Sequence, residues 1–153
     1  MPSADCLVIE NATAILPDRL LPRARVVLED GHIARVGGAA TRVLRGARVL
    51  DARGGYVSPG FVDVHVHGGG GADFMDGTPD AVRTACATHA RHGTTTIFPT
   101  RTTGSPEEIA QMLEACRVVR DEGGEPTGAR IAGGHLYGPF FAPDNVGCHS
   151  EAG

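Results

Sequence analysis

Three side chains that can bind a cation or move a proton recur at every second position of residues 61–67. Asp63, His65 and His67 alternate with valines there, so on a β-strand all three would share one face. Two neutral imidazoles side by side suit Zn²⁺, Mn²⁺ or Fe²⁺. Two satisfied core histidines are the alternative. The position at the end of a predicted strand, just before a glycine run, favours a divalent-metal site at His65 and His67.

Two further segments could contribute to a site. The run Gly68–Gly71 could cradle a phosphate or form a flexible turn, and it matches neither the Gly-Lys-Ser/Thr loop nor a dinucleotide fingerprint. His135 and Tyr137 lie two residues apart at the end of another predicted strand, so they would share a face. For Tyr137 we favour a buried, hydrogen-bonded phenol over a ligand, because its ordinary pKa is about 10.

The remaining histidines and cysteines fit structural roles. His89 falls on the apolar stripe of a predicted helix and is expected to be a packed histidine rather than a ligand. Cys86 and Cys116 also fall on buried helix stripes and are expected to be core thiols, whereas His32 and His92 occupy predicted surface or turn positions. The four cysteines are far apart and form no CxxC pair. With no export signal at the N-terminus, they are expected to be reduced thiols in a cytoplasmic protein.

The elements that would position these residues differ between two parts of the chain. Residues 1–57 are β-rich, with short strands predicted at 6–9, 25–28 and 48–51, and Asp30-Gly31 predicts a tight hairpin turn into 32–36. From Ser58 onward strands alternate with helices. Strands are predicted at 61–67, 94–98 and 130–136; helices are predicted after Thr78-Pro79 and after the capping box Ser105–Glu108.

The order strand–helix–strand–helix–strand predicts an α/β fold with a parallel sheet and right-handed crossovers. The strand at 61–67 is apolar at nearly every position, which is typical of a parallel strand covered on both faces. The sheet could be open, or it could begin a barrel of eight strands, which needs about 250 residues. Only 95 residues follow Ser58, so three strands fit.

Composition excludes several classes of protein. The chain has 153 residues, 41% hydrophobic and 21% charged, with a formal net charge of −4. It is too apolar for a disordered segment and lacks the basic excess of a nucleic-acid binder. No apolar run reaches the length of a membrane span. We therefore expect a globular, cytoplasmic protein that contacts neither nucleic acid nor membrane.

Taken together, several motifs resemble the amidohydrolase superfamily, and within it the family of N-acetylglucosamine-6-phosphate deacetylases. The superfamily is indicated by the leader and by the first strand with its two histidines. The narrower resemblance depends on the motifs that follow. In order along the chain, the motifs are residues 30–37 (DGHIARVG), 58–68 (SPGFVDVHVHG), 68–76 (GGGGADFMD), 93–96 (GTTT), 98–100 (FPT), 135–140 (HLYGPF) and 147–149 (GCH).

The resemblance implies a small β-sandwich, built from both chain ends, beside a (β/α)8 barrel. Residues 1–57 would be part of the sandwich, and residues 58–153 the first three or so βα units of the barrel. His65 and His67 would hold a divalent metal, zinc in the first instance with iron or manganese as alternatives. The implied reaction hydrolyses the acetamide of N-acetylglucosamine 6-phosphate to glucosamine 6-phosphate and acetate. Cys148 and His149 would contact this amino-sugar phosphate.

The chain departs from the family in two respects. Tyr137 stands where the family has a glutamate that binds the metal, and the later metal histidines and the catalytic aspartate of the family have no counterpart in these 153 residues. No catalytic residue is therefore expected within this chain. An unpaired apolar barrel edge also predicts a homo-oligomer, or dependence on further C-terminal sequence.

Two other interpretations stay open. The chain could be an inactive remnant with a structural or partner-binding role, in which Tyr137 marks loss of the metal. It could also derive from another amidohydrolase, one that acts on cyclic amides. The glycine run followed by Asp73, Met75 and Asp76 favours the deacetylase over this last class.

Overall fold

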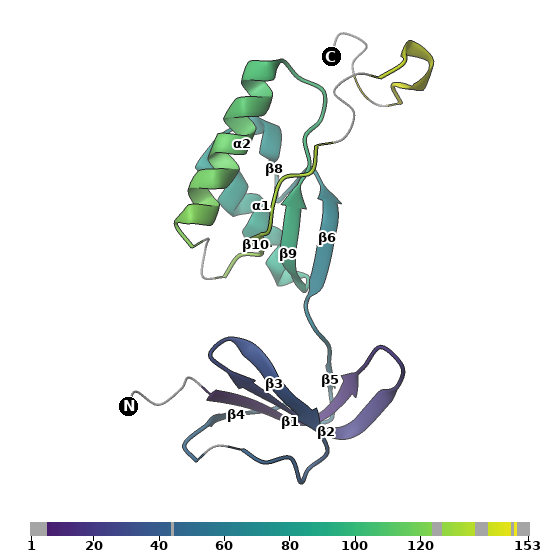
Figure 1. The fold of residues 1–153 in the computed structure, drawn as a ribbon, viewed down its shortest axis with the longest axis vertical. Coiled ribbons are helices and arrows are strands. Elements are labelled where there is room, and N and C mark those ends of the chain that lie inside the picture. The colour runs from purple at the N-terminus through teal and green to yellow at the C-terminus, as the bar shows by residue number, and fades with distance from the viewer. Residues whose placement is uncertain (1–5, 44, 124–126, 137–140, 148, 150–153) are drawn as a thin grey trace. The chain divides into compact units, whose positions relative to one another are not determined.

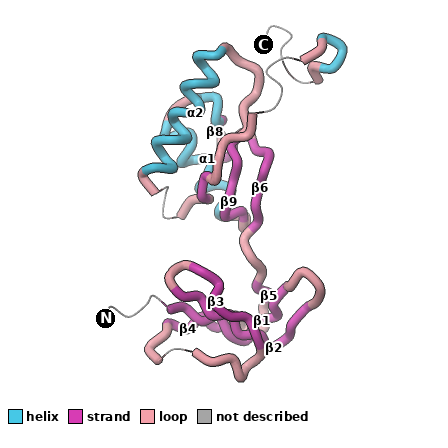
Figure 2. Tube along the Cα trace, viewed as in Figure 1, coloured by secondary structure: helices cyan, strands magenta, loops and turns pink. Residues whose placement is uncertain are grey.

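The computed structural model describes residues 6–43, 45–123, 127–136, 141–147 and 149. It divides into two units, residues 1–59 and 60–153, and each is considered by itself (Figures 1 and 2). Among the described helices, none combines the length and apolarity that a membrane span requires.

The N-terminal unit is a five-stranded sheet. Its strands are β1 (Cys6–Ile15), β2 (Leu20–Glu29), β3 (His32–Gly37), β4 (Arg48–Asp51) and β5 (Tyr56–Val57). Their order is β3-β2-β1-β4, and β5 also pairs with β1. The pairs β1–β2 and β2–β3 are antiparallel, whereas β4 and β5 run parallel to β1. The predicted strands are present, and β1 and β2 are longer than expected.

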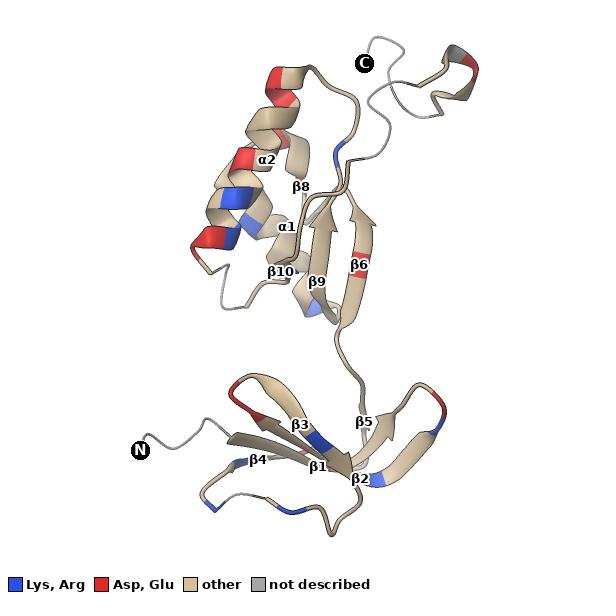
Figure 3. Ribbon diagram, in the orientation of Figure 1, with Lys and Arg blue, Asp and Glu red and all other residues tan. Residues whose placement is uncertain are grey.

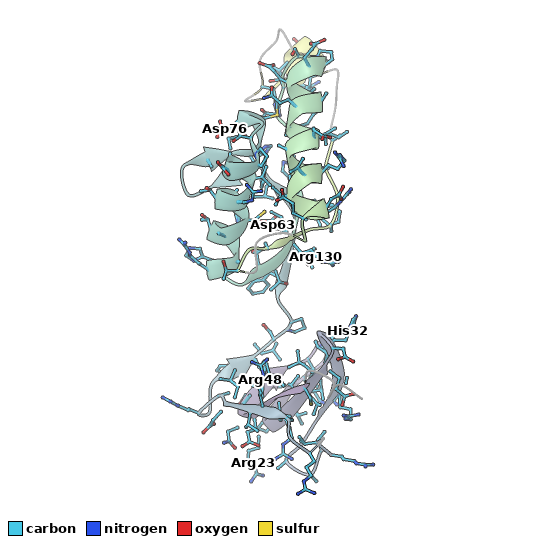
Figure 4. All side chains as sticks on the ribbon, turned by 90° about the vertical axis from the view of Figure 1, so that its left-hand side faces the viewer. Arg23, His32, Arg48, Asp63, Asp76 and Arg130 are labelled. Atoms are coloured by element: carbon cyan, nitrogen blue, oxygen red, sulfur yellow. The ribbon has the colours of Figure 1, made fainter. Side chains whose placement is uncertain are left out.

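The turn between β2 and β3 is the predicted hairpin. Asp30 and Gly31 have φ values of 51° and 77°, and Glu29 pairs directly with His32. Positive φ at both central residues is the conformation in which aspartate followed by glycine is favoured. The hairpin prediction is therefore confirmed, and His32 is exposed at its tip (Figure 4).

One face of this sheet carries a small cluster of buried side chains. Cys6, Val8 and Val27 are buried together. On the opposite face, strands β1 to β3 line an apolar groove of about 140 Å³ whose walls include Ile9 and Leu28. Ile33 and Val36, which also line the groove, are 54% and 42% exposed.

The C-terminal unit has the predicted strand–helix–strand–helix–strand order and is a mixed α/β structure (Figure 1). Its parallel sheet has the order β10-β9-β6. The strands are β6 (Phe61–Val66), β9 (Thr94–Pro99) and β10 (Arg130–Ile131); the helices are α1 (Pro79–Arg91) and α2 (Pro106–Asp121). A two-stranded ribbon, β7 (Gly68–Gly69) and β8 (Ala72–Asp73), and the 3-10 turns η1 (Phe74–Asp76) and η2 (Pro143–Asn145) complete the described elements.

Local capping explains where both helices begin. The Thr78 side chain accepts a hydrogen bond from the Ala81 N–H at the start of α1. Ser105 and Glu108 form a reciprocal capping box at the start of α2. Each cap is followed by proline at the first helical position, where the missing N–H costs nothing. Both predicted helix starts are confirmed.

The helices cover one face of the three strands (Figure 1). Side chains from α1, α2 and the sheet form a single apolar cluster, which comprises Val66, Phe74, Val82, Ala85, Cys86, Ile97, Met112, Ala115, Cys116, Val119, Ala129 and Ile131. Charged residues recur along α2 (Figure 3). On α2, for example, Arg117 pairs with Glu114 at 2.6 Å and with Asp121 at 2.9 Å.

Two expectations about the strands are wrong. First, residues 61–67 were expected to be covered on both faces, yet Phe61, Val62 and Val64 are 64%, 60% and 61% exposed. Within the described part of the chain β6 is an edge strand, and the helices lie on one face only. An apolar run predicts a strand, but it does not predict whether other elements pack on one face of that strand or on both.

Second, the strand expected at 130–136 is formed only at Arg130–Ile131. Pairing with β9 resumes further on as an isolated bridge between Thr100 and His135. Gly133 and Gly134 lie in between, and glycine weakens a strand because it has no side chain to pack. A Cβ atom on Gly133 would approach the Phe98 ring to 3.3 Å.

Candidate functional site

The structure brings the two histidines of the first parallel strand together. His65 lies in β6 and His67 directly follows that strand. Their Nε2 atoms are 3.1 Å apart, and the ring centroids are 5.1 Å apart with the planes inclined by 69°. Two zinc–nitrogen bonds of about 2.05 Å at a tetrahedral angle would place the nitrogens about 3.3 Å apart. The separation of this pair is therefore compatible with two ligands of one ion.

The orientation of the His67 ring is set by a main-chain carbonyl. Its Nδ1 lies 3.1 Å from the Thr100 carbonyl oxygen. Because a carbonyl only accepts, Nδ1 must carry the hydrogen, and in the neutral ring Nε2 then carries the lone pair. A carbonyl partner on the second ring nitrogen is the usual support of a metal-binding histidine. His67 therefore presents an available donor atom toward His65.

Asp63 lies in the same strand, but its side chain bonds to the main chain and not to an imidazole ring. Its Oδ1 accepts a hydrogen bond of 3.1 Å from the backbone N–H of His65, and the residue is half-buried in β6 (Figure 4). The carboxylate thus helps to fix the backbone at the position that carries the first imidazole.

His135 also lies at this cluster, and its contact with His65 was not predicted from the sequence. Its ring centroid is 5.0 Å from that of His65, at an angle of 82°. The only signal in the sequence was its place near the end of the third predicted strand. Which strands pair, and in what register, decides that residues 65 and 135 meet, and that information is not local.

The ligand set among the described residues is incomplete. No group of three or more His, Cys, Asp or Glu side chains within it is arranged to hold a metal ion. A catalytic zinc site uses three protein ligands and an open position. His65 and His67 fit as two of them, and a third would have to come from elsewhere.

The other residues expected at the site are only partly described. Tyr137 and Cys148 lie outside the described residues. His149 is described, and its ring stacks on Phe141 with centroids 4.7 Å apart and planes inclined by 11°. Its orientation is therefore fixed by a neighbour from the same segment.

The glycine run forms a tight turn. Gly68 and Gly69 pair with Asp73 and Ala72, and the two glycines between them, Gly70 and Gly71, have φ values of 65° and 84°. His89 from α1 supports this ribbon, because its Nε2 lies 2.9 Å from the Gly68 carbonyl oxygen. His89 is thus the packed histidine that the sequence predicted.

Cys86 and Cys116 are buried free thiols in the apolar cluster, as expected. Burial raises the pKa of Cys86 to about 11. Burial, together with the neighbouring Cys86, raises the pKa of Cys116 to about 12. Since the thiolate is the reactive form of cysteine, both side chains behave as core residues.

Comparisons with known proteins agree with this architecture. Residues 56–136 match the model of the Amidohydrolase family. The chain is 40% identical over 106 residues to N-acetylglucosamine-6-phosphate deacetylase from Mus musculus, covering 67% of this chain and 25% of that protein. It is 37% identical over 91 residues to N-acetylgalactosamine-6-phosphate deacetylase from Escherichia coli O157:H7, covering 60% of this chain and 24% of that protein.

A solved structure extends the likeness to the fold. It shows a variant of N-acetyl-D-glucosamine-6-phosphate deacetylase from Mycobacterium smegmatis in complex with N-acetyl-D-glucosamine-6-phosphate. The match has a TM-score of 0.72 at 29% identity and covers 98% of this chain and 36% of that chain. The matched region is about a quarter of the length of the mouse and Escherichia coli deacetylases. Since the family model matches more than half of its residues, the chain belongs to the amidohydrolase family.

Proposed function

We propose that this chain contributes to a metal-dependent hydrolase that removes the acetyl group from N-acetylglucosamine 6-phosphate, yielding glucosamine 6-phosphate and acetate. The observation that carries the proposal is the pair of converging imidazoles, His65 and His67, at the carboxyl end of the first parallel strand. In α/β folds that end of the sheet is where active sites are built. The names of the similar proteins support the substrate class, an N-acetylated amino-sugar 6-phosphate.

The donor set indicates which ion the pair would hold. Imidazole nitrogen suits zinc, with iron and manganese as alternatives. Such an ion would polarise the acetamide carbonyl and lower the pKa of a water molecule. The chain's own contribution is positional: His65 and His67 supply two nitrogen donors, and the Thr100 carbonyl keeps the His67 Nε2 lone pair available. The third ligand would lie outside the described residues.

We also propose a role for each unit. Residues 1–57 would form part of a small β-sandwich, and residues 58–153 the first three βα units of a (β/α)8 barrel. The apolar groove on β1 to β3 and the exposed apolar side chains of β6 support this assignment, because both surfaces need cover. Further chain would provide that cover in a complete enzyme, and self-association would provide it otherwise.

Cys148 and His149 are proposed to contact the amino-sugar phosphate. The stacking of His149 on Phe141 supports a fixed imidazole that could donate a hydrogen bond to an anionic or hydroxylated ligand. The similar proteins include enzymes named for both the gluco and the galacto sugar. A comparison of these two phosphorylated sugars would therefore define the specificity.

Metal analysis tests the proposal directly. The purified chain is stripped with a chelator, equilibrated with Zn²⁺, Fe²⁺ or Mn²⁺, and its metal content and affinity are measured. We expect His65→Ala and His67→Ala each to weaken Zn²⁺ binding more than tenfold, as expected for loss of one of two ligands. His92→Ala removes an exposed histidine at the end of α1 and should leave the affinity unchanged. Equal metal binding by all four proteins would overturn the metal site.

Tyr137 favours one competing interpretation, the inactive remnant, because a neutral phenol replaces the glutamate of the family. Tyr137→Glu should then strengthen Zn²⁺ binding, since it adds an anionic ligand. Acetate release from N-acetylglucosamine 6-phosphate, by the chain mixed with the C-terminal part of a related deacetylase, tests the reaction. If, in this mixture, the Tyr137→Glu chain is active and the wild-type chain is not, the inactive remnant is favoured. Ring opening of a cyclic amide in place of acetate release would favour the other class of amidohydrolase.

A further inference from the structure

We propose that Thr100 is the positioning residue of the imidazole cluster: its hydroxyl and its carbonyl together determine which nitrogen of His135 and of His67 carries hydrogen. The significance of this device for a metal rests on the proposed function, but the device itself depends only on contacts of the described residues. Thr100 directly follows β9 and is fully buried. From that place it contacts all three strands of the sheet or their extensions.

The first set of contacts joins Thr100 to β6. The regular pairing of β6 with β9 is interrupted between Asp63 and Val66. Thr100 bonds to β6 at the end of this interruption. Its backbone N–H donates to the Val66 carbonyl oxygen at 2.8 Å, and its Oγ1 accepts from the Val66 N–H at 3.0 Å. The main chain between His65 and His67 is therefore held on both its donor and its acceptor side by one residue.

The hydroxyl has two further neighbours, and their chemistry fixes the direction in which its hydrogen points. Oγ1 lies 3.1 Å from the Phe98 carbonyl oxygen and 3.2 Å from Nδ1 of His135. A threonine hydroxyl has one hydrogen to donate and two lone pairs. The Val66 N–H occupies one lone pair, and the Phe98 carbonyl can only receive the hydrogen. The second lone pair is then left for His135, whose Nδ1 must carry hydrogen.

The carbonyl oxygen of Thr100 fixes the tautomer of His67 in the same way. It accepts from Nδ1 of His67 at 3.1 Å, so this ring also has hydrogen on Nδ1 and the lone pair on Nε2. Without a metal, the contact of 3.1 Å between the two Nε2 atoms then requires His65 to donate from Nε2. Thr100 thus sets two tautomers directly and the third through His67.

The consequence is that one hydrogen must change position before the two Nε2 atoms can bind a cation. The hydrogen on Nε2 of His65 lies between the two Nε2 atoms, so for both of them to bind one ion His65 must carry its hydrogen on Nδ1 instead, and the third ligand must still be supplied. Loss of a residue that orients a metal ligand typically weakens metal affinity by about 10–100-fold. Thr100→Val preserves the shape but lacks the hydroxyl that accepts the Val66 N–H between the two ligands. We expect its effect to lie near the lower end of that range, because the backbone carbonyl on His67 persists.

The test measures tautomers in the metal-free chain by long-range proton–nitrogen correlation NMR, which distinguishes protonated from unprotonated ring nitrogens. In the wild-type chain we expect hydrogen on Nδ1 of His67 and His135 and on Nε2 of His65. Thr100→Val should release only His135 from this pattern, and Thr100→Ser, which retains a hydroxyl, should restore it. His89, held by the Gly68 carbonyl, is the internal control and should not change.

The outcomes separate this inference from the proposed function. Hydrogen on Nε2 of His135 in the wild-type chain, or an unchanged His135 tautomer in Thr100→Val, overturns the inference whatever the metal does. The wild-type spectrum alone decides the matter if Thr100→Val does not fold. Normal Zn²⁺ binding by His65→Ala and His67→Ala would overturn the metal site and leave the tautomer result standing. With the metal site intact, about tenfold weaker Zn²⁺ binding in Thr100→Val and recovery in Thr100→Ser would support both.

Discussion

The two sheets of this protein differ in how far their apolar side chains are exposed. In the C-terminal unit, Ile97 in the central strand β9 is fully buried beneath helices that contribute Val82 and Met112 to the same cluster. In the N-terminal unit, β4 presents Val49 and Leu50 at 58% and 53% exposure. Both sheets contain the β-branched and apolar residues that favour strands. The difference is what covers them.

This contrast shows that strand formation and burial are separate outcomes. Hydrogen bonding and alternation are sufficient to form the N-terminal strands, which include the small buried cluster of Cys6, Val8 and Val27 with its neighbours. Burying a large apolar cluster requires a second layer, and α1 and α2 provide it in the C-terminal unit. The stability of the two units should therefore respond differently to the same kind of substitution.

The largest effect is expected from Phe74→Ala. Phe74 is fully buried in the C-terminal cluster, whereas Phe61 on β6 is 64% exposed. Removing a buried phenylalanine ring costs about 3–5 kcal/mol, and substitution at an exposed position changes stability by about 0.5 kcal/mol or less. Urea unfolding of Phe74→Ala and of the matched control Phe61→Ala measures both. Equal losses would break the contrast between covered and uncovered faces.

Alkaline pH should weaken the covered core next. The pKa values of Cys86 and Cys116, about 11 and about 12, exceed the ordinary value of 9.0, so the unfolded chain loses these protons first. The stabilisation is present below pH 9 and is lost as the pH rises through the folded-state values. The slope is at most about 1.4 kcal/mol per pH unit for each thiol.

Unfolding measured from pH 8 to pH 11, with Cys86→Ala as the control, tests this dependence. The substitution removes one titrating group, so the free energy of unfolding should fall less steeply with pH than in the wild-type chain. A wild-type stability that is constant above pH 9 would show that the thiols are more hydrated than their burial indicates.

A smaller effect is expected where the structure is local. Ser105→Ala removes the side chain that accepts the Glu108 N–H at the start of α2. Loss of such a cap typically costs about 1 kcal/mol, and Ser105→Asp, which can also accept, should recover most of it. Thermal unfolding followed by circular dichroism provides the measurement. A loss as large as that of Phe74→Ala would mean that α2 depends on its cap more than on its packing.

The smallest change in folding stability is expected on the open groove. Ile33→Thr combined with Val36→Thr replaces partly exposed groove residues while retaining β-branched side chains that suit a strand. We expect a change of about 0.5 kcal/mol or less in unfolding, but reduced self-association in sedimentation velocity. Thr13→Val, on the same sheet outside the groove, is the control. Unchanged self-association would mean that the chain associates through another surface, and β6 would be the next candidate.

Much of this structure follows from the sequence because the responsible interactions are local. The Asp30-Gly31 turn and the caps at Thr78 and Ser105 each involve groups within a few residues of one another. The alternation of His65 and His67 likewise predicts two rings on one side of a strand, as observed. These features need no knowledge of the rest of the fold.

The tertiary structure alone decided the exposure of β6, the break in the strand after Ile131 and the meeting of His65 with His135. It also decided that the buried Thr100 would lie between these histidines. Residue 100 is 35 positions from residue 65 and 35 from residue 135, and the parallel order β10-β9-β6 brings all three together. A pattern within one segment specifies the direction of a side chain, but not the neighbour that it meets, because that neighbour depends on which strands pair and in what register.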